Sequence, residues 1–536
     1  MLSTFSPLKQ RFFRMLWMTN VVSLMGTLMH EVGAAWLMTT LAPTPFMVAM
    51  VQTASTFPFF LLALPSGALA DIIDRRRLLL MTQTWMLAAS VVLGVLTILG
   101  MTTPMVLLVL TFFLALGAAV NAPSWQAVIP ELVDRSELPS AIALGSVGFN
   151  LARAVGPVIG GLIVAALGPG ITFLLNGVSF FGVVVVLKKW KKAQRTSTLK
   201  EERMVSAMRA GIRYIRHAPE VRSVLVHTTF FSFLCSPLWA FLPIVSKEYL
   251  GLGSSGYGIL LGFFGFGALL GVPFLPVLRQ RFSLNLVVLI ASNIFALVMA
   301  AMANLHSFVF LTIIMAVGGM VWLILISTLI AVVQSVIPSW VRGRVLSVHM
   351  LTFFGGLAGG STLFGFIAGL VGISVTLNVV AGCLVIATII TWNYKLISGE
   401  GLDLNPSMHW PSLVVSCQPD LDEGPVLVVV EYYIDPKRSP EFTDSMRSLK
   451  MIRRRDGAIR WNLFHDLTDP GHYIESYIVE SWGEHLRQHE RITVADREIE
   501  KNVLSFHLDK EPPKVMHFLA EAFPVKNKKT DTTGSC

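Results

Sequence analysis

Long apolar runs fill most of the chain between about residues 15 and 392. Each run has the length of about 20 residues that an α-helix needs to cross the hydrocarbon core of a bilayer. The runs are interrupted near Pro43, Asp71, Thr103, 131–139, 168–170, 251, 279–281, 304–306, 338–344 and 372. This pattern predicts twelve membrane-spanning helices, six on each side of a polar stretch at residues 191–220.

Basic residues are concentrated in one of the two alternating sets of loops. That set contains Arg75–Arg77, Arg135, 188–216, Arg279, Arg281, Arg342 and Arg344, whereas the opposite set contains essentially only Lys247. Loops rich in Lys and Arg remain on the cytoplasmic side of the membrane. We therefore expect both termini and the polar central stretch to be cytoplasmic.

The central stretch has its own periodicity. Arg203, Arg209, Arg213 and Arg216 alternate with apolar residues at helical spacing. This pattern predicts an amphipathic helix on the inner surface of the membrane.

The composition changes after Trp392 and predicts a soluble domain. Strands and helices are expected in the order β-α-β-β-α-β, at Val426–Ile434, 440–455, 458–467, 472–482, 484–504 and 515–519. This order is typical of a ferredoxin-like fold. The fold class is thus an all-α membrane protein with two six-helix halves, followed by a soluble α+β domain.

The expected domain boundaries follow from these patterns. They are an N-terminal half at 1–190, a central loop at 191–220, a C-terminal half at 221–395, a linker at 396–423, the ferredoxin-like domain at 424–520 and a disordered tail at 521–536.

Composition excludes several other classes of protein. Charged residues make up 14% of the chain and hydrophobic residues 54%, whereas a soluble domain carries about 25% charged residues. The net charge of +9 could indicate nucleic-acid binding, but the basic residues lie where cytoplasmic loops are predicted, so we expect no nucleic-acid partner.

The cysteines are scattered without metal-ligand spacing, at Cys235, Cys383, Cys417 and Cys536. We expect no metal, no cofactor and no disulfide framework, and the first apolar run lacks a signal-peptide cleavage site.

A charged motif separates the second and third predicted spans. It reads Gly67-Ala-Leu-Ala-Asp71-Ile-Ile-Asp74-Arg75-Arg76-Arg77. It resembles the loop between the second and third helices of the major facilitator superfamily of secondary transporters, although Asp74 stands where that family usually has Gly. The resemblance implies a latch in which Asp71 pairs with Arg75 or with the start of span eleven, near Arg342. The alternative is a loop that only determines topology.

An internal repeat supports two related halves. Gly271, Leu275, Arg279 and Arg281, between spans eight and nine, align with Gly67, Asp71, Arg75 and Arg77. The second copy keeps the bases and loses the acid. Two halves related in this way are typical of a transporter that binds its substrate between them.

A second motif lies in span five and consists of Gly156, Pro157, Gly160 and Gly161. Small residues at this spacing let two membrane helices approach closely. The motif resembles the Gly-Pro-x-x-Gly-Gly element of exporters in the same superfamily, which implies export. The alternative is a motif that serves helix packing alone.

Ionisable side chains within the predicted spans are rare. His30 and Glu31 lie in span one, and Arg153 lies in span five. Charges at such depth usually face a cavity or a partner. A Glu31–Arg153 pair broken by protonation would couple transport to a proton gradient; the alternatives are a static ion pair or a Glu31 side chain that reaches the membrane surface.

Other polar residues in or beside the spans could line a cavity or bond neighbouring helices. They are Gln52, Asn121, Asn150, His227, Asn293, Gln334, His349 and Asn378. Aromatic residues are abundant on the same spans, including Phe231, Trp239 and Phe264. We expect a mostly apolar cavity, which suits a bulky amphipathic substrate.

Two longer segments resemble one branch of the superfamily. They are Asn121-Ala-Pro-Ser-Trp-Gln-Ala-Val-Ile-Pro-Glu131 and Asn150-Leu-Ala-Arg153-Ala-Val-Gly156-Pro157. They are similar to the enterobactin-exporter-like, or transmembrane secretion effector, branch. The resemblance implies proton-driven export of a siderophore-like or drug-like molecule through a bacterial inner membrane by alternating access.

The topology of the soluble domain resembles the antibiotic biosynthesis monooxygenase-like domains, which form dimeric α+β barrels. Trp461, His465, His472, His485 and His489 could then form an active site. The charged residues around His485 and His489 favour a solvated helix instead, so we predict a regulatory or dimerising module rather than an enzyme.

Two further functions remain open. An importer or lipid flippase could use the same fold, and a bifunctional protein could combine a transporter with a monooxygenase-like domain. The direction of transport would identify the first, and haem binding or oxygen consumption by the soluble domain would identify the second.

Overall fold

The computed structural model describes residues 5–66, 73–134, 136–190, 204–399, 401–410 and 419–521. Gly67 and Asp71 of the loop motif, and most of the predicted disordered tail, lie outside these ranges. The chain forms two compact units. The first comprises the described residues of Met1–Lys200, Ser223–Val332 and Leu346–Leu396, and the second those of Glu201–Arg222, Val333–Val345 and Ile397–Cys536.

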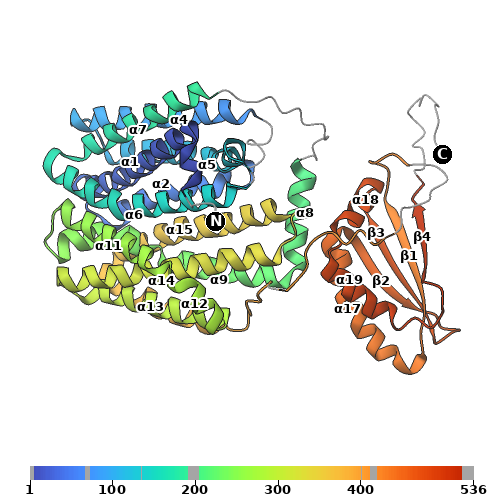
Figure 1. Ribbon diagram of the computed structural model, residues 1–536. Coiled ribbons are helices and arrows are strands. Elements are labelled where there is room, and N and C mark those ends of the chain that lie inside the picture. The colour runs from blue at the N-terminus through green and yellow to red at the C-terminus, as the bar shows by residue number, and fades with distance from the viewer. Residues whose placement is uncertain are drawn as a thin grey trace, which may run out of the picture. The chain divides into compact units, whose positions relative to one another are not determined.

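Helices make up the first unit (Figure 1). The N-terminal half contains α1 (Arg11–Leu41), α2 (Pro45–Leu62), α4 (Arg75–Ile98), α5 (Pro104–Leu132), α6 (Leu138–Leu167) and α7 (Pro169–Lys189), after the short helix η1 (Ser6–Lys9). The C-terminal half contains α9 (Pro219–Cys235), α10 (Pro237–Ile244), the π-helical turn η2 (Val245–Tyr249), α11 (Ser254–Gly271), α12 (Phe274–Arg281), α13 (Leu284–Asn304), α14 (Phe308–Val336), α15 (Arg342–Val371) and α16 (Ile373–Thr391). Helix α14 ends, and helix α15 begins, in the second unit.

The predicted number of spans is confirmed. Within the described residues, 12 helical segments are long and apolar enough to cross a membrane. The segment α9–α10–η2 counts as a single span, Pro219–Tyr249.

Local sequence sets the ends of these helices. Thr44, Asp74 and Thr103 each accept a hydrogen bond from the amide of the residue three positions later, which satisfies a free amide of the first turn. Gly168 and Gly372 have φ angles of 84° and 88° and form the tight turns before α7 and α16. Glycine adopts such angles without steric strain, so the last helix pair of each half turns in the same way.

The second unit contains helix α8 (Met204–His217), residues 333–345 and the soluble domain. The elements of that domain are β1 (Val426–Tyr433), η3 (Pro436–Arg438), α17 (Ser439–Asp456), β2 (Ala458–His465), β3 (His472–Val479), α18 (Trp482–Arg491), α19 (Val494–Leu504) and β4 (Lys514–Leu519). The antiparallel sheet has the order β2-β3-β1-β4. This order confirms the ferredoxin-like topology.

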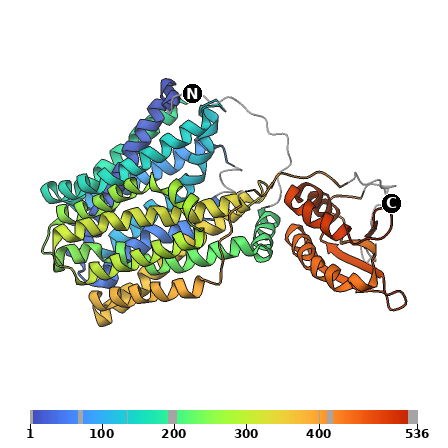
Figure 2. The ribbon, with the colours of Figure 1, turned by 60° about the horizontal axis from the view of Figure 1, so that its bottom comes forward.

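The three long helices of the soluble domain lie on one face of the sheet (Figure 1; Figure 2). Alternate residues of β1 and β3 are buried, as expected for strands covered on one face. Val430, Tyr432 and Tyr473 pack against Phe442 and Met446 of α17. The covered face forms the core, and the opposite face is considered below.

Two predictions for the soluble domain are wrong. The single helix expected at 484–504 is divided, because Thr493 caps a new helix in a reciprocal pair of hydrogen bonds with Asp496. Helix α18 is also not a solvated helix: His485 and Gln488 are each 1% exposed. Glu484 and Arg491 form an ion pair on that face, and the ring of His485 packs against those of His489 and His517, although His485 Nε2 has no hydrogen-bond partner among the described residues.

Helix α8 forms, as its periodicity predicts. Ala210 and Tyr214 are each 2% exposed, and α8 packs against α17 within the second unit. Ile212, one of the apolar residues of the periodic pattern, is 56% exposed, so the predicted place of α8 on the inner membrane surface stays a prediction.

Candidate functional site

The glycine motif of α6 contacts helices of both halves. A Cβ atom at Gly160 would lie 2.8 Å from the Cα of Met29 in α1, and one at Gly161 would lie 2.5 Å from the carbonyl oxygen of Ser254 in α11. Gly156 likewise faces α1, at Met25 and Leu28. The motif therefore brings α6 into backbone contact with a helix of its own half and with one of the other half.

Further contacts join the two halves near the ends of the same helices. Lys247 Nζ donates a 2.8 Å hydrogen bond to the carbonyl oxygen of Thr39, and Ser254 Oγ donates one of 3.1 Å to the carbonyl oxygen of Gly161. The hydroxyls of Thr53 and Thr362 lie 3.0 Å apart. In the predicted orientation all of these residues are nearer the outer surface, so the outer side is closed.

Glu31 and Arg153 lie near the middle of this arrangement. Glu31 is exposed although it belongs to a membrane span, and Arg153 is half-buried. Within the described part of the chain neither forms an ion pair, but their charges interact, and the charge of Glu31 also acts on Tyr257 of α11. Glu31 and Arg153 therefore lie close enough for their charges to interact, and Tyr257 places α11 of the other half within the same range.

Aromatic rings surround the guanidinium of Arg153. Its Cζ atom lies 5.9 Å from the ring centre of Phe149, 5.8 Å from that of Phe264 and 6.0 Å from that of Trp322. Phe264 and Trp322 belong to the C-terminal half, so these cation–π contacts cross between the halves.

The aromatic wall extends from Trp322 through the C-terminal half. Its ring centre lies 4.4 Å from that of Trp239, 5.5 Å from that of Phe231 and 6.0 Å from that of Phe353. Through Phe354, Phe353 connects to Phe59 of α2. The structure thus packs a cluster of aromatic side chains beside Arg153, in which Phe231, Phe264 and Trp322 are buried.

The other candidate residues have different surroundings. Both ring nitrogens of the buried His30 lack a hydrogen-bond partner among the described residues, and its ring packs 4.5 Å from that of Phe173. Asn121 accepts a 3.0 Å hydrogen bond from Thr82 and joins α5 to α4. Asn150 donates to the backbone of its own helix, and Gln52 is half-buried in α2.

The described bases of the predicted gate bind within their own half. Arg75 forms a 2.6 Å ion pair with Glu131 of α5. Arg76 donates to the carbonyl oxygens of Leu187 and Lys188, where it complements the carboxyl end of α7. Arg342 is exposed at the start of α15, and its predicted contact with Asp71 falls outside the described residues.

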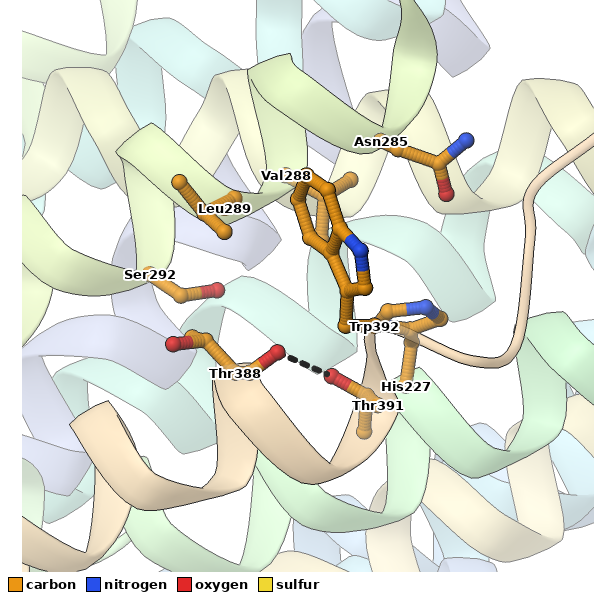
Figure 3. A pocket seen from close by; sticks show the side chains of 8 residues that line it. All are labelled: His227, Asn285, Val288, Leu289, Ser292, Thr388, Thr391 and Trp392. Carbon is orange, nitrogen blue, oxygen red and sulfur yellow. Dashed lines mark hydrogen bonds between the residues drawn. The ribbon is translucent and has the colours of Figure 1, made fainter.

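A small polar pocket lies between α9, α13 and α16 (Figure 3). It is lined by His227, Asn285, Val288, Leu289, Ser292, Thr388, Thr391 and Trp392. His227 Nε2 lies 3.0 Å from the carbonyl oxygen of Tyr394. The cavity volume of about 20 Å³ holds about one water molecule, so the pocket is too small to be the substrate site.

A buried polar network occupies the core of the soluble domain. Glu475 is fully buried and accepts hydrogen bonds from Tyr432, Arg453 and Trp461 at 3.0, 3.2 and 2.8 Å. Arg453 also pairs with Glu500 at 3.0 Å. Each of these side chains has an oppositely charged or hydrogen-bonding partner, and Arg453 Nη1 is the one nitrogen of that guanidinium without a hydrogen bond among the described residues; such bonds inside a protein are stronger than in water.

Three histidines lie beside this network. The ring centre of His485 lies 5.1 Å from that of His489 and 4.8 Å from that of His517. Burial, together with the charges that His517 and His489 would carry, lowers the pKa of His485 to about 3. Burial also lowers the pKa of His489 to about 4 and the pKa of His517 below its usual value. All three are therefore neutral at pH 7.

Comparison with known proteins identifies the family. The sequence profile described as transmembrane secretion effector matches residues 2–525. The chain belongs to the transmembrane secretion effector family. This match identifies the chain as a secondary transporter of the major facilitator superfamily. The matched residues include the soluble domain.

Curated relatives are distant but match more than half of the chain. The staphyloferrin A transporter of Staphylococcus aureus is 24% identical over 61% of this chain and 82% of its own length. The multidrug efflux pump Tap of Mycolicibacterium fortuitum is also 24% identical, over 56% of this chain and 75% of its own length.

Solved structures support the fold. A POT family transporter in complex with 5-aminolevulinic acid superimposes with a TM-score of 0.61 over 72% of this chain and 96% of its own, at 13% identity. At this identity the likeness concerns the fold alone.

The aromatic residues around Arg153 were only partly anticipated. Phe264 was one of many candidate wall residues, whereas Phe149 and Trp322 were not singled out. The sequence around Arg153 and the sequence around Phe264 and Trp322 contain no periodicity that would show these rings approaching the guanidinium.

Proposed function

We propose that this transporter exports an amphipathic small molecule, siderophore-like or drug-like, in exchange for protons by alternating access. The observation that carries the proposal is the placement of Glu31 and Arg153. Both ionisable side chains lie in membrane spans, their charges interact, and rings from both halves lie around Arg153. The relatives named for siderophore transport and for multidrug efflux support export.

Protonation of Glu31 would change the charge next to Arg153. While Glu31 is ionised, its charge stabilises the guanidinium, since a nearby opposite charge favours the charged form. The ionised carboxylate would also bind a cationic group of the substrate from the cytoplasm, and a proton taken up from outside would remove that charge and release the substrate there. The aromatic wall around Trp322 would hold the apolar part. Release of the proton to the cytoplasm would restore the first state.

The orientation belongs to the same proposal. With both termini cytoplasmic in a bacterial inner membrane, α6 and α11 close the outer side through Gly161. The expected domain boundaries and the latch formed by Asp71 are retained as parts of this proposal.

Transport into inverted membrane vesicles tests the proposal. Vesicles with an imposed proton gradient, acid inside, are challenged with siderophores and with cationic dyes. Wild-type protein should accumulate one of these compounds only while the gradient is present, and Glu31→Gln should abolish the dependence on the gradient.

A matched control is available in Glu248→Gln. Glu248 is an exposed carboxylate of η2, outside the proposed site, so its substitution should leave gradient-driven uptake unchanged. Uptake by the wild type that is equal with and without the gradient would refute proton exchange and favour the flippase or a facilitator.

We further propose that the soluble domain, which resembles the monooxygenase-like domains in topology, joins two copies of the chain. The sheet face opposite the helices carries Leu427, Val429, Ile474 and Ile478 in its centre, by the register of β1 and β3. Phe464 and Phe518, on the two outer strands, are 54% and 49% exposed. Two such faces stacked together would remove these side chains from water.

Cross-linking in membranes tests this second proposal. Phe464→Asp places a charge between the stacked faces and should reduce the cross-linked dimer at least tenfold. Leu467→Asp, in the exposed turn after β2, is the control. Equal dimer in wild type and Phe464→Asp would refute the pairing.

A further inference from the structure

The soluble domain, helix α8 and the connector at residues 333–345 form one compact unit. Helix α8 leads directly into α9, and the connector joins α14 to α15. The soluble domain is therefore held together with two segments at the ends of membrane helices, although the sequence separates them from it by more than 70 residues.

Helix α8 binds the soluble domain through Arg213 and Tyr214. Arg213 forms an ion pair with Glu484 of α18, and the two side chains are 19% and 9% exposed. Tyr214 is stacked under the guanidinium of Arg455, with the Cζ atom 5.5 Å from the ring centre.

Glu484 also pairs with Arg491 at 2.6 Å. Although burial raises its pKa, the ion pairs with Arg491 and Arg213 lower the pKa of Glu484 to about 2. The carboxylate that receives Arg213 is thus ionised at any physiological pH.

Trp340 of the connector contacts both α8 and the soluble domain. Its ring lies 5.7 Å from that of Tyr214 in an edge-on arrangement, and the guanidinium of Arg491 lies 4.5 Å above it. Trp340 is thus held between α8 on one side and α18 on the other. A Cβ atom at Gly211 would lie 2.9 Å from the Cβ of Arg344, so α8 also touches the first turn of α15.

We propose that the soluble domain is a regulatory clamp, formed by Arg213 and Tyr214 of α8, Trp340 of the connector, and Arg455, Glu484 and Arg491 of the domain. The clamp fixes the start of α15, which is the segment that receives the predicted cytoplasmic latch. In the structure this clamp is formed together with the closed outer side, so it favours the state in which the cytoplasmic side is open. This inference rests on the proposed alternating access, and it assigns the soluble domain a role in that cycle.

Helix α8 provides a matched pair of variants. Arg213→Ala removes the buried ion pair from the α8 side and leaves the soluble domain intact. Arg209→Ala removes a similar side chain one turn earlier, whose 3.7 Å contact with Glu480 joins side chains that are 70% and 61% exposed. Exposed pairs of this kind contribute little, so Arg209→Ala is the control.

Two readouts on the full-length protein in lipid separate docking from regulation. Docking is measured with Ala210→Cys, in a background without the four native cysteines, by the rate of maleimide labelling at this buried site. The transport cycle is measured by the distance distribution between spin labels at Arg77 and Arg281, which are exposed at the predicted cytoplasmic ends of the two halves.

We expect Arg213→Ala to raise the rate of labelling at position 210 at least tenfold and to raise the cytoplasmically closed fraction at least threefold. Trp340→Ala should act in the same way, and Arg209→Ala should change neither quantity. An unchanged labelling rate in Arg213→Ala would overturn the clamp. Faster labelling with an unchanged or smaller closed fraction would overturn its regulatory role.

Neither readout needs a substrate. A wild-type protein that does not transport in vesicles would therefore contradict the proposed function. The clamp would still be tested by the labelling rate at position 210 and by the distance between the spin labels. Conversely, a wild type that transports at the same rate as Arg213→Ala, with equal closed fractions, would contradict the clamp alone.

Discussion

The soluble domain should lose stability in mild acid because of His485. This side chain is 1% exposed, and its pKa is lowered to about 3. In the unfolded chain the imidazole takes up a proton near its usual pKa of about 6.5. Between these two values the unfolded state binds more protons than the folded state. Stability is therefore complete above about pH 6.5 and falls as the pH decreases.

The size of the effect follows from the two pKa values. One pH unit below the unfolded value, at about pH 5.5, protonation of the unfolded imidazole lowers the free energy of unfolding by about 1.4 kcal/mol. His489, with its pKa lowered to about 4, is only half-buried, so solvent screening reduces its contribution to a fraction of that amount. The sum is about 1.5 to 2 kcal/mol, which corresponds to a decrease of about 1 M in the urea midpoint.

The assay uses the full-length protein in detergent. Val428→Cys, fully buried in β1, reports unfolding of the soluble domain through maleimide labelling, in a background without the native cysteines. Urea midpoints are compared at pH 7.5 and 5.5. His485→Gln should remove most of the difference between them, whereas Leu486→Gln on the exposed side of α18 should keep it. Equal midpoints at both pH values in the parent protein would refute the reasoning.

Three further predictions concern the membrane part and the polar network. Gly161→Val should force the outer ends of the halves apart, since backbone atoms of α11 leave no room for a Cβ; Thr39→Cys should then react faster with an impermeant maleimide, and an unchanged rate would contradict the proposed outer closure. Glu475→Leu should cost the soluble domain about 3 to 5 kcal/mol, because it leaves Arg453 with one fewer buried partner; a urea midpoint within 0.3 M (about 0.5 kcal/mol) of the wild type would contradict the network. Trp322→Ala should raise the KM for an aromatic substrate at least tenfold, and an unchanged KM would exclude the aromatic wall from binding.

Most of the fold could be predicted from the sequence, since its determinants are local. Apolar length, the caps at Thr44, Asp74 and Thr103, and the glycines at 168 and 372 define where helices begin and end. Strand alternation gave the order of the soluble domain. The division between α18 and α19 also had a local signal, the spacing of Thr493 and Asp496, which the charged periodicity of the region concealed.

The candidate site was less accessible to sequence reasoning. Glu31 and Arg153 stood out because charges in membrane spans are rare. The rings of Phe264 and Trp322 reach Arg153 only through the packing of two halves that are distant in sequence. The burial of His485 similarly depends on strand β4 at the end of the chain, so no local pattern reveals it.

The contact between α6 and α11 has a consequence for the speed of gating. Gly161, Gly258 and Gly265 leave backbone facing backbone along this seam, whereas Gly262 faces the side chain of Val158. A glycine has no side-chain rotamers to order, so separating and rejoining the two helices requires no change of side-chain conformation on those faces. The barrier to opening the outer side should then arise mainly from the weak contacts that are lost and from the entry of water or lipid. A seam of this kind can open and close many times without the slow repacking that interlocked side chains would impose.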